Sequence, residues 1–539
     1  MVFLSFANDS RVLKGVPPLL RRSIKPLTAS SPRHKRLSQT FKPSIRHRVL
    51  TAPIWQRCLA LVVIVPIFAA GGGASAYYYR LHQWASALKL SDLPAAPLVT
   101  SKHRILVISP HCDDETLGVG ALISDARKAG VPVTIAFLTN GDGFRVAASR
   151  TLGEMNVSPS DFVRFAEVRQ TESLAADAQL GVAGRDVVFL GYPDRGLKPM
   201  WEKNWSRQDL FRSYFTNHNH SPYARTYSPR TPYCGEALLA DLVKLMERVR
   251  PTDIYVTHPA DDHPDHYIAA AFTQAALREC REVKTSPWAD RAQLHFYLVH
   301  RGDWPLPQGL HADMALLPPT GLAKLDTKWT AFTASPSAVD AKQRALEKYV
   351  SQTEISGRFL RSFVRINEIF GEMPAYDADP EKTNSPLPHH ALLSASARDA
   401  AGDDVIRYAT PSADLTGITV RKISKETLRV SLSTRRPASG SIRYTLLIRS
   451  MGNAANAAAK DDDNSSFQQM DLEPTVNKTS GQRELQKDIP LSTIGMTGAE
   501  KNRCVWVAAE TRLAAKLPIV DRVGYRAFDL SDSAVSLTP

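Results

Sequence analysis

The sequence predicts an α/β fold, a parallel sheet with helices on both faces, followed by a second domain made of strands. Two observations carry this prediction. Between residues 103 and 375, short runs of β-branched and aromatic residues alternate with amphipathic stretches, which is the pattern of a parallel sheet buried on both faces. Beyond residue 400, apolar residues alternate with period two and no helical pattern separates the runs, which favours a β-sandwich-like domain.

A basic segment precedes the predicted folded part. The chain has 539 residues, with 67 Lys+Arg against 54 Asp+Glu and a formal net charge of +13. Residues 1–57 hold 12 Lys+Arg and one acid, Asp9, so eleven of the thirteen charges lie in this tail and the other 482 residues carry +2. The tail is predicted to be disordered and cytoplasmic, and no nucleic-acid-binding surface is expected on the folded part.

The longest uncharged run, Cys58 to Tyr79, follows the tail directly. Its 22 residues are enough for a helix to cross a bilayer, which takes roughly 20 residues. The preceding positive charge predicts a cytoplasmic N-terminus and an exported remainder. We therefore expect a single-pass anchor at 58–79, in contact with membrane lipid, and a connector at 80–102. Two alternatives stay open: signal-peptide cleavage after Ala76, which would release a secreted protein, and an organelle transit peptide.

The elements of the α/β domain, 103–375, follow in order. Strands are predicted at 104–109, 133–139, 186–190, 253–257 and 295–299. Helices are predicted at 117–129, 162–180, 236–250 and 267–281, and a further helical region at 338–349 continues toward Phe370. In a sheet of this kind ligands bind at the carboxyl ends of the strands. The loops at those ends are therefore where catalytic residues are expected.

A Pro- and charge-rich linker at 376–400 leads to the β-rich domain, 401–539. Its strands are predicted at 417–423, 427–433, 441–449, 503–510 and 523–528. The polar, low-complexity stretch 452–466 is predicted to be a mobile loop. Because few contacts cross such a linker, a fragment of residues 100–375 is expected to fold alone. The β-rich domain would then add binding and no chemistry.

Two polar loops follow the first and fourth predicted strands. Residues 109–115 read SPHCDDE and residues 257–266 read THPADDHPDH, which together hold four histidines and six acidic residues. Taken singly, Asp-Asp-Glu is more typical of a helix N-cap, and His-Pro-Asp-His is more typical of an Asx turn. On two strands of one sheet, however, neutral imidazoles and carboxylates predict a site for a divalent first-row metal, most simply zinc.

These two loops resemble the metal motifs of a known family. PHCDDETLGVGALI (110–123) is similar to the PHPDDE segment of the PIG-L/LmbE family of zinc-dependent N-deacetylases, and HPADDHPDHYIAA (258–270) to its HPxDxHPDH motif. Weaker matches follow in the same order: TNGDG at 139–143, RQTE at 169–172, LGYPD at 190–194, and the segment from Lys342 to Gln352. The resemblance covers about residues 100–375 and implies a Rossmann-like fold.

The resemblance also implies roles for the motif residues. Three of them would bind zinc, or Fe(2+) as the alternative metal: His111, Asp114 and His266. Asp113 would be the general base. His263 would be the acid or oxyanion stabiliser, with Asp265 orienting it. These roles fit the chemistry, because an amide carbonyl must be polarised, its oxyanion needs a hydrogen-bond donor, and the amine leaves only when protonated.

Substrate contacts are implied less specifically. Four residues would bind substrate: Arg169, Asp194, Tyr192 and His258. For Arg169 the alternative is a surface ion pair with Glu172 or Glu167. Eight aromatic residues lie between Asp194 and Gly235; they either stack on sugar rings or a lipid-linked glycan, or form a small core of their own.

The leading functional hypothesis is a membrane-anchored, exported, zinc-dependent deacetylase. It would hydrolyse the N-acetyl group of an N-acetylglucosamine unit in a glycoconjugate or polysaccharide. One alternative is an amidase acting on another N-acyl sugar conjugate. A second, from a different class, is a carbohydrate-binding surface protein that acts through the β-rich domain; the intact set of ligands and base argues against it.

Overall fold

The computed structural model describes residues 89–97, 99–282, 286–323, 325–377, 396–401, 409–451, 467–476, 483–496, 504–514 and 517–530. Contacts within the chain separate Met1–Ala74 from Ser75–Pro539, and every described residue belongs to the second unit. The predicted tail 1–57, the predicted span 58–79 and the first part of the connector 80–102 lie outside the described residues. Among the helices that are described, none combines the length and the apolar character that a membrane crossing requires.

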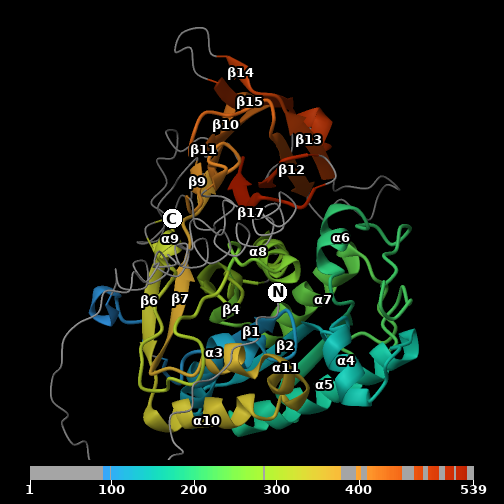
Figure 1. Ribbon diagram of the computed structural model, residues 1–539, viewed down its shortest axis with the longest axis vertical. Coiled ribbons are helices and arrows are strands. Elements are labelled where there is room, and N and C mark those ends of the chain that lie inside the picture. The colour runs from blue at the N-terminus through green and yellow to red at the C-terminus, as the bar shows by residue number, and fades with distance from the viewer. Residues whose placement is uncertain are drawn as a thin grey trace, which may run out of the picture. The chain divides into compact units, whose positions relative to one another are not determined.

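A seven-stranded mixed sheet forms the centre of the α/β part (Figure 1). Its strand order is β3-β2-β1-β4-β5-β7-β6. The first five strands are parallel and correspond to the five predicted ones: β1 (Ile105–Ser109), β2 (Val133–Thr139), β3 (Val187–Tyr192), β4 (Asp253–Thr257) and β5 (Gln293–Tyr297).

Two strands that the sequence did not predict extend this sheet. Strands β6 (Lys328–Thr333) and β7 (Asn367–Glu372) are antiparallel to each other, and β7 is antiparallel to β5. The predicted parallel sheet is therefore only part of a mixed sheet. The predicted helical continuation toward Phe370 is present as far as Arg361 but stops before Phe370, which lies in β7. Both segments have only six residues of mixed polarity, which is too short for periodicity to separate strand from helix.

Helices cover both faces of the sheet. They are α3 (Asp114–Lys128), α4 (Arg145–Leu152), α5 (Pro159–Gln179), α6 (Leu197–Glu202), α7 (Gly235–Val249), α8 (Pro264–Glu282), α9 (Thr320–Ala323), α10 (Pro336–Leu346) and α11 (Val350–Arg361). Along β1, Leu106 and Ile108 pack in one cluster with α7 and α8, whereas Ile105 and Val107 pack in another with α3 and α10. Because successive side chains point to opposite faces, a strand covered on both sides is apolar throughout.

Two five-stranded sheets make up the C-terminal part. The first has the order β14-β15-β11-β10-β9 and the second β13-β12-β16-β17-β8. Their bounds are β8 (Tyr376–Asp377), β9 (Ser396–Arg398), β10 (Leu415–Ser424), β11 (Thr427–Thr434), β12 (Arg443–Met451), β13 (Phe467–Leu472), β14 (Thr475–Val476), β15 (Arg483–Pro490), β16 (Cys504–Arg512) and β17 (Asp521–Asp529). Val430 of β11 and Val507 of β16 belong to one buried cluster, so the two sheets share a core.

Five of these strands, β10, β11, β12, β16 and β17, match the predicted ones. Neighbouring strands pair antiparallel, apart from β8 beside β17. The stretch 452–466, predicted to be a loop, lies outside the described residues, as does 378–395 of the predicted linker.

The α/β part and the C-terminal sheets pack closely on each other. Trp201 of α6 contacts the rings of Trp506 in β16 and Tyr525 in β17, with centroids 5.8 and 5.7 Å away. All three belong to one buried cluster that continues into α7 and α8. The expectation that few contacts cross between the two parts is therefore wrong. Strands β12 and β16 are buried along almost their whole length, because one face packs in the C-terminal core and the other on the α/β part.

Candidate metal centre and active site

The candidate site lies at the carboxyl edge of the five parallel strands. The residues 111–114 follow β1, 140–143 follow β2, Asp194 follows β3, 258–266 follow β4, and His300 follows β5. The carboxyl ends of parallel strands meet at one edge of a sheet. Segments that are far apart in the sequence are therefore neighbours there, as the sequence pattern predicted.

The three predicted metal ligands meet in a small triangle of donor atoms. The Nδ1 atom of His111 lies 3.2 Å from Oδ2 of Asp114 and 3.0 Å from Nε2 of His266. The third side, from His266 Nε2 to Asp114 Oδ2, measures 3.1 Å. In a tetrahedral site with zinc bonds of about 2.0–2.1 Å, ligand atoms are roughly 3.3 Å apart. The donor types and their spacing therefore fit a zinc ion.

A second layer of carboxylates faces the far side of each imidazole. His111 Nε2 lies 3.3 Å from Oδ2 of Asp265 and 3.5 Å from Oδ1 of Asp194. His266 Nδ1 lies 3.2 Å from Oδ2 of Asp261. A carboxylate at the far nitrogen fixes the ring and leaves the near nitrogen free to ligate. Both rings are thus oriented for metal binding.

The electrostatics of this cluster favour positive charge. Burial lowers the pKa of His266, but Asp114 and Asp261 outweigh burial and raise this pKa to about 9. The same carboxylates that favour a proton on the ring favour a cation between the ligands. A buried group of acids of this density is stable only when positive charge accompanies it.

Asp113, the predicted base, adopts an unusual backbone conformation beside a buried arginine. Its φ is 122°, a region that L-residues rarely adopt and that is found at functional sites. Its Oδ2 lies 3.5 Å from Arg169 Nη2. Burial raises the pKa of Asp113 to about 8, against the lowering effect of Arg169. Asp113 is therefore held next to the ligand Asp114 in a site that controls its protonation.

Arg169 is hydrogen-bonded to two loops of the site, those that follow β1 and β2. It is only 3% exposed, donates through Nη1 to the carbonyl of Gly141 at 3.0 Å, and donates through Nη2 to the carbonyl of Cys112. A Cβ atom at Gly141 would lie 1.6 Å from Nη1, so this turn requires glycine. The alternative of a surface ion pair with Glu167 or Glu172 is wrong. The described contacts of the guanidinium are with the protein's own loops and with Asp113. The prediction was that Arg169 contacts substrate.

The structure changes the relation between His263 and Asp265. The Asp265 carboxylate accepts hydrogen bonds from the backbone N–H groups of Arg195 (2.6 Å) and Leu197 (3.2 Å) and faces His111. Its carboxylate does not orient His263, because the partners of that carboxylate are His111 and the N–H groups of Arg195 and Leu197. Instead, the backbone N–H of Asp265 donates to Nδ1 of His263 at 3.3 Å.

His263 nevertheless lies at the site as a hydrogen-bond donor. Its ring is 4.7 Å from the His111 ring and 5.0 Å from that of His266. Because Nδ1 accepts a backbone hydrogen bond, the ring proton belongs on Nε2. Burial, together with the neighbouring imidazoles, holds the pKa of His263 well below its usual range. The neutral ring can donate from Nε2 without being an imidazolium.

The other predicted substrate contacts divide into one residue at the site and two away from it. Asp194 lies beside His111 and accepts a hydrogen bond from the Gly143 N–H at 2.9 Å. The Tyr192 hydroxyl donates to Asp241 of α7 at 2.9 Å and is fully buried. His258 is also buried; it stacks on Trp329 and pairs with the Thr327 hydroxyl. Tyr192 and His258 therefore act within the core in this structure.

Two residues of the site had no predicted role. His300 follows β5, and its ring is 4.8 Å from the His266 ring. Asp261 is completely buried and receives the N–H groups of His263 (3.0 Å), Val299 (3.0 Å) and His300 (2.9 Å) besides facing His266. The signal for His300 was available, because it comes directly after a predicted strand whose carboxyl end belongs to the same edge.

Most of the aromatic residues between Asp194 and Gly235 pack in the protein interior. Trp201, Trp205, Tyr223 and Tyr233 are buried, and Trp201, Trp205 and Tyr233 belong to the large cluster that includes α7, α8 and strands of the C-terminal sheet. They therefore have a packing role, as the alternative held, but in the main core and not in a separate core of the insertion. Phe215 lies close to Gly143 and the Asp194 carboxylate, and Tyr214 is 85% exposed. Phe211 and Tyr227 are partly buried against the large cluster. Phe215 is therefore the aromatic residue of this segment that lies beside the site, with the Tyr214 ring 5.5 Å from its own.

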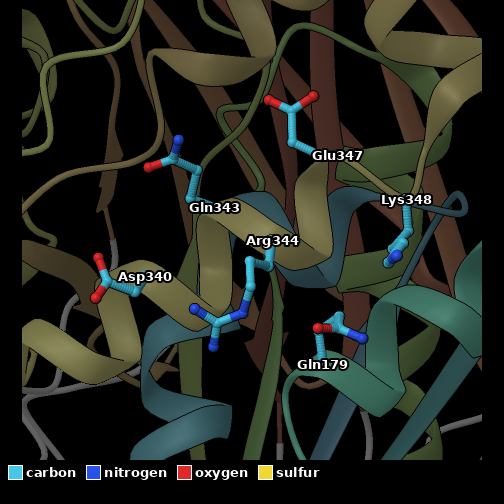
Figure 2. A pocket seen from close by; sticks show the side chains of 6 residues that line it. All are labelled: Gln179, Asp340, Gln343, Arg344, Glu347 and Lys348. Carbon is cyan, nitrogen blue, oxygen red and sulfur yellow. The ribbon is translucent and has the colours of Figure 1, made fainter.

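A surface pocket elsewhere on the molecule is separate from this site. It is lined by Gln179 at the end of α5 and by residues of and just after α10: Asp340, Gln343, Arg344, Glu347 and Lys348 (Figure 2). None of these residues belongs to the histidine–aspartate cluster. Its mixed charges do not indicate a ligand class.

The fold and the cluster define the class: an α/β protein with a histidine–aspartate cluster that could hold a metal ion at the carboxyl edge of its sheet, as in metal-dependent hydrolases. Residues 106–277 match the profile of a family described as "PIG-L: GlcNAc-PI de-N-acetylase". This match confirms the resemblance seen in the two metal motifs, which both lie within the matched residues.

Curated relatives and solved structures were found as well. A Bacillus subtilis protein named probable N-acetyl-alpha-D-glucosaminyl L-malate deacetylase 2 is 28% identical over 158 residues, 28% of this chain and 66% of that protein. A 1D-myo-inositol 2-acetamido-2-deoxy-alpha-D-glucopyranoside deacetylase 1 from Saccharopolyspora erythraea is 31% identical over 194 residues, 34% of this chain and 57% of that protein. The chain thus spans less than two thirds of either relative. The structure of N,N'-diacetylchitobiose deacetylase from Pyrococcus horikoshii is 17% identical, with a TM-score of 0.31, over 55% of this chain and 91% of that one.

Proposed function

We propose that this protein is a zinc-dependent deacetylase that hydrolyses the N-acetyl group of an N-acetylglucosamine unit in a glycoconjugate or polysaccharide. The observation that carries the proposal is the triangle of His111 Nδ1, Asp114 Oδ2 and His266 Nε2, with sides of 3.0 to 3.2 Å. Three protein ligands and an open position are the ligand count of a catalytic zinc site. The names of the relatives, which are deacetylases of N-acetylglucosamine-containing compounds, support the substrate class.

The ligands are His111, Asp114 and His266, and the chain's own groups around them handle protons and charge. When bound, zinc supplies a Lewis acid that polarises an amide carbonyl and lowers the pKa of water to about 7. Asp113 accepts the proton of the attacking water. Asp113 would be ionised when a cation is bound at Asp114, because a nearby opposite charge lowers the pKa of a carboxyl group. Arg169, 3.5 Å from Asp113, acts in the same direction.

His263 stabilises the opposite side of the reacting carbonyl. Its Nε2–H donates to the oxygen on which negative charge develops, and a neutral imidazole suffices for this contact. The proton taken up by Asp113 then passes to the leaving amine, which departs only when protonated. Asp265 and Asp194 keep His111 in place by facing its Nε2.

The proposed location is the membrane, with the catalytic domain exported. The net charge of +11 over residues 1–57, followed by the uncharged run 58–79, supports an N-terminus that stays cytoplasmic. Release after cleavage near Ala76 is the alternative. A polymeric or surface-bound substrate follows from export, whereas the malate and inositol conjugates in the relatives' names favour a second candidate, a small N-acetylglucosaminyl conjugate.

The test combines metal analysis with product analysis. The purified protein is expected to hold one zinc per chain and to release acetate from a panel of N-acetylated glycans and small N-acetylglucosaminides. His266→Ala is expected to lose both. A His266→Ala variant with stoichiometric zinc and full activity would show that the metal assignment is wrong. Zinc binding without acetate release from any N-acetylated sugar would refute the substrate class.

A further inference from the structure

We infer that Arg522, in the C-terminal sheet, is a positioning residue for the metal centre. Through Arg522, this sheet contributes to the geometry of the active site. The inference deepens the proposed function, because it rests on His266 as a zinc ligand. It begins with one contact. The Arg522 guanidinium donates through Nη2 to the backbone carbonyl of Asp261 at 2.7 Å, inside the loop that follows β4.

Arg522 holds both ends of the short segment that carries the ligand. At one end lies the Asp261 carbonyl. At the other, the guanidinium carbon is 3.7 Å from the centroid of the Tyr267 ring, and Tyr267 directly follows His266. A guanidinium this close to an aromatic face makes a cation–π contact in addition to its hydrogen bond. A single side chain of β17 therefore contacts both residue 261 and residue 267, which flank His263 and His266.

Asp261 links the Arg522 contact to the proposed ligand His266. Its carboxylate lies 3.2 Å from His266 Nδ1 and also receives the N–H groups of His263 and His300 at 3.0 and 2.9 Å. The residue has no exposed surface. A shift of its backbone changes the orientation of the His266 ring and the position of His263 together. A contact to the Asp261 carbonyl thus acts on the metal ligand through one intervening residue.

A bulge in β17 makes this contact geometrically possible. Val507 of β16 pairs with Arg526, but Ala509, two residues on, pairs with Val523, three residues back. This extra residue in β17 reverses the side on which its residues point, so Arg522 and Tyr525 both face the α/β part. Bulges re-aim side chains in this way. Gly524, within the bulge, is packed so closely that a Cβ atom there would lie 2.0 Å from the carbonyl oxygen of Pro259.

The strand that carries Arg522 is itself anchored on the α/β part. The Tyr525 hydroxyl donates to Glu202 of α6 at 3.0 Å. Lys198 of α6 pairs with Glu510 of β16 at 2.5 Å. These two polar contacts, the first buried and the second partly buried, lie beside the Trp201 packing described above, so β17 is fixed relative to the loop of residues 258–266. The C-terminal sheet is a rigid support for that loop rather than a tethered accessory.

The experiment measures zinc affinity of the full chain without any substrate. Competition with a chromogenic chelator gives the dissociation constant of zinc for the unaltered protein, Arg522→Ala, Arg522→Lys and Arg278→Ala. Arg278→Ala is the matched control. It removes another contact across the same interface, to Asp529 at 3.4 Å, but Arg278 lies twelve residues beyond His266 along α8, roughly 18 Å at 1.5 Å per residue. Thermal unfolding with and without zinc is recorded for each variant.

Arg522→Ala is expected to weaken zinc binding about 10-fold, the lower end of the effect of residues behind metal ligands. Arg522→Lys is expected to restore part of the affinity, because it keeps one donor and the charge. Arg278→Ala is expected to lower thermal stability without changing zinc affinity. If Arg522→Ala does not fold, Arg522→Lys tests the inference instead. The inference then requires Arg522→Lys to bind zinc more weakly than the unaltered protein does.

Two results would overturn the inference. One is unchanged zinc affinity in Arg522→Ala or, where that variant does not fold, in Arg522→Lys. The other is an equal loss of zinc affinity in Arg278→Ala, which would trace the effect to the stability of the interface in general. Failure of the proposed function looks different: the unaltered protein would then not bind zinc, or would bind it and release no acetate.

Discussion

Asp265→Asn tests the part of the centre that the structure reassigned. The Asp265 carboxylate is fully buried, accepts the N–H groups of Arg195 and Leu197 at 2.6 and 3.2 Å, and faces His111 Nε2 at 3.3 Å. Asparagine has nearly the same shape and keeps one oxygen for the backbone, but it removes the negative charge from the far side of the His111 ring. The substitution therefore weakens the orientation of His111 while leaving the His263 contact, made by the backbone of residue 265, unchanged.

The magnitudes follow from these contacts. Loss of a carboxylate behind a ligating histidine costs about 10- to 100-fold in metal affinity, which is about 1.4–2.7 kcal/mol. Asp265→Ala additionally removes the acceptor of the buried Leu197 N–H and of the partly buried Arg195 N–H, at up to about 1–3 kcal/mol each. Its free energy of unfolding in the absence of metal should therefore fall by about 2–6 kcal/mol, and that of Asp265→Asn by less.

Chelator competition measures the zinc affinity, and urea unfolding in the presence of EDTA measures the stability. The control is Asp262→Asn in the same loop, because the Asp262 side chain is partly exposed and faces Arg301 (3.1 Å) and the Gly302 N–H (2.8 Å) instead of a ligand. It should leave zinc affinity unchanged. If Asp265→Asn binds zinc as tightly as the unaltered protein and only turnover falls, Asp265 acts on His263 after all and our reassignment is wrong.

Three further predictions concern the base, the interface and a remote acid. Asp113→Asn, which tolerates the positive φ, should retain zinc by metal analysis while turnover falls by about 10²–10⁴; loss of zinc would exchange the roles of Asp113 and Asp114. Trp201→Ala should lower the free energy of unfolding of the full chain by about 3–5 kcal/mol, and an unchanged urea midpoint would contradict this. A fragment of residues 100–375 should be aggregated or unfolded by circular dichroism, because it exposes this cluster; a folded, zinc-binding fragment would contradict that expectation. Burial raises the pKa of Glu279 to about 7, above the value of about 4.3 expected in the unfolded chain. Between about pH 4.3 and 7 the folded state therefore binds more protons than the unfolded state, so the free energy of unfolding falls as the pH rises through this range. Glu279→Gln should remove that part of the pH dependence in urea unfolding, and an unchanged profile would show that Glu279 titrates normally.

The three residues proposed as metal ligands could be identified from the sequence because a local rule governs their position. Strand periodicity places the ends of β1 and β4, and parallel pairing brings those ends to one edge of the sheet, so the loops of residues 111–114 and 258–266 had to be neighbours. The three ligands are indeed 3.0 to 3.2 Å apart. The same rule pointed to the loop after β5, where His300 lies, although this single histidine carried no motif to draw attention to it.

Residue patterning was enough to predict the parallel core, the edge that carries the site and the residue types that suit a divalent metal. Which carboxylate faces which ring could be seen only in the folded protein, because the helical phase at Asp265 and His266 sends two adjacent side chains to different neighbours. The tertiary structure alone placed Tyr192 and His258 in the core, and it alone joined the C-terminal sheets to the site. That junction depends on one extra residue in β17, which leaves hydrophobic patterning unchanged but turns Arg522 and Tyr525 to the same side. Periodicity records which residues are buried, whereas the partner that buries them is a property of the packed chain.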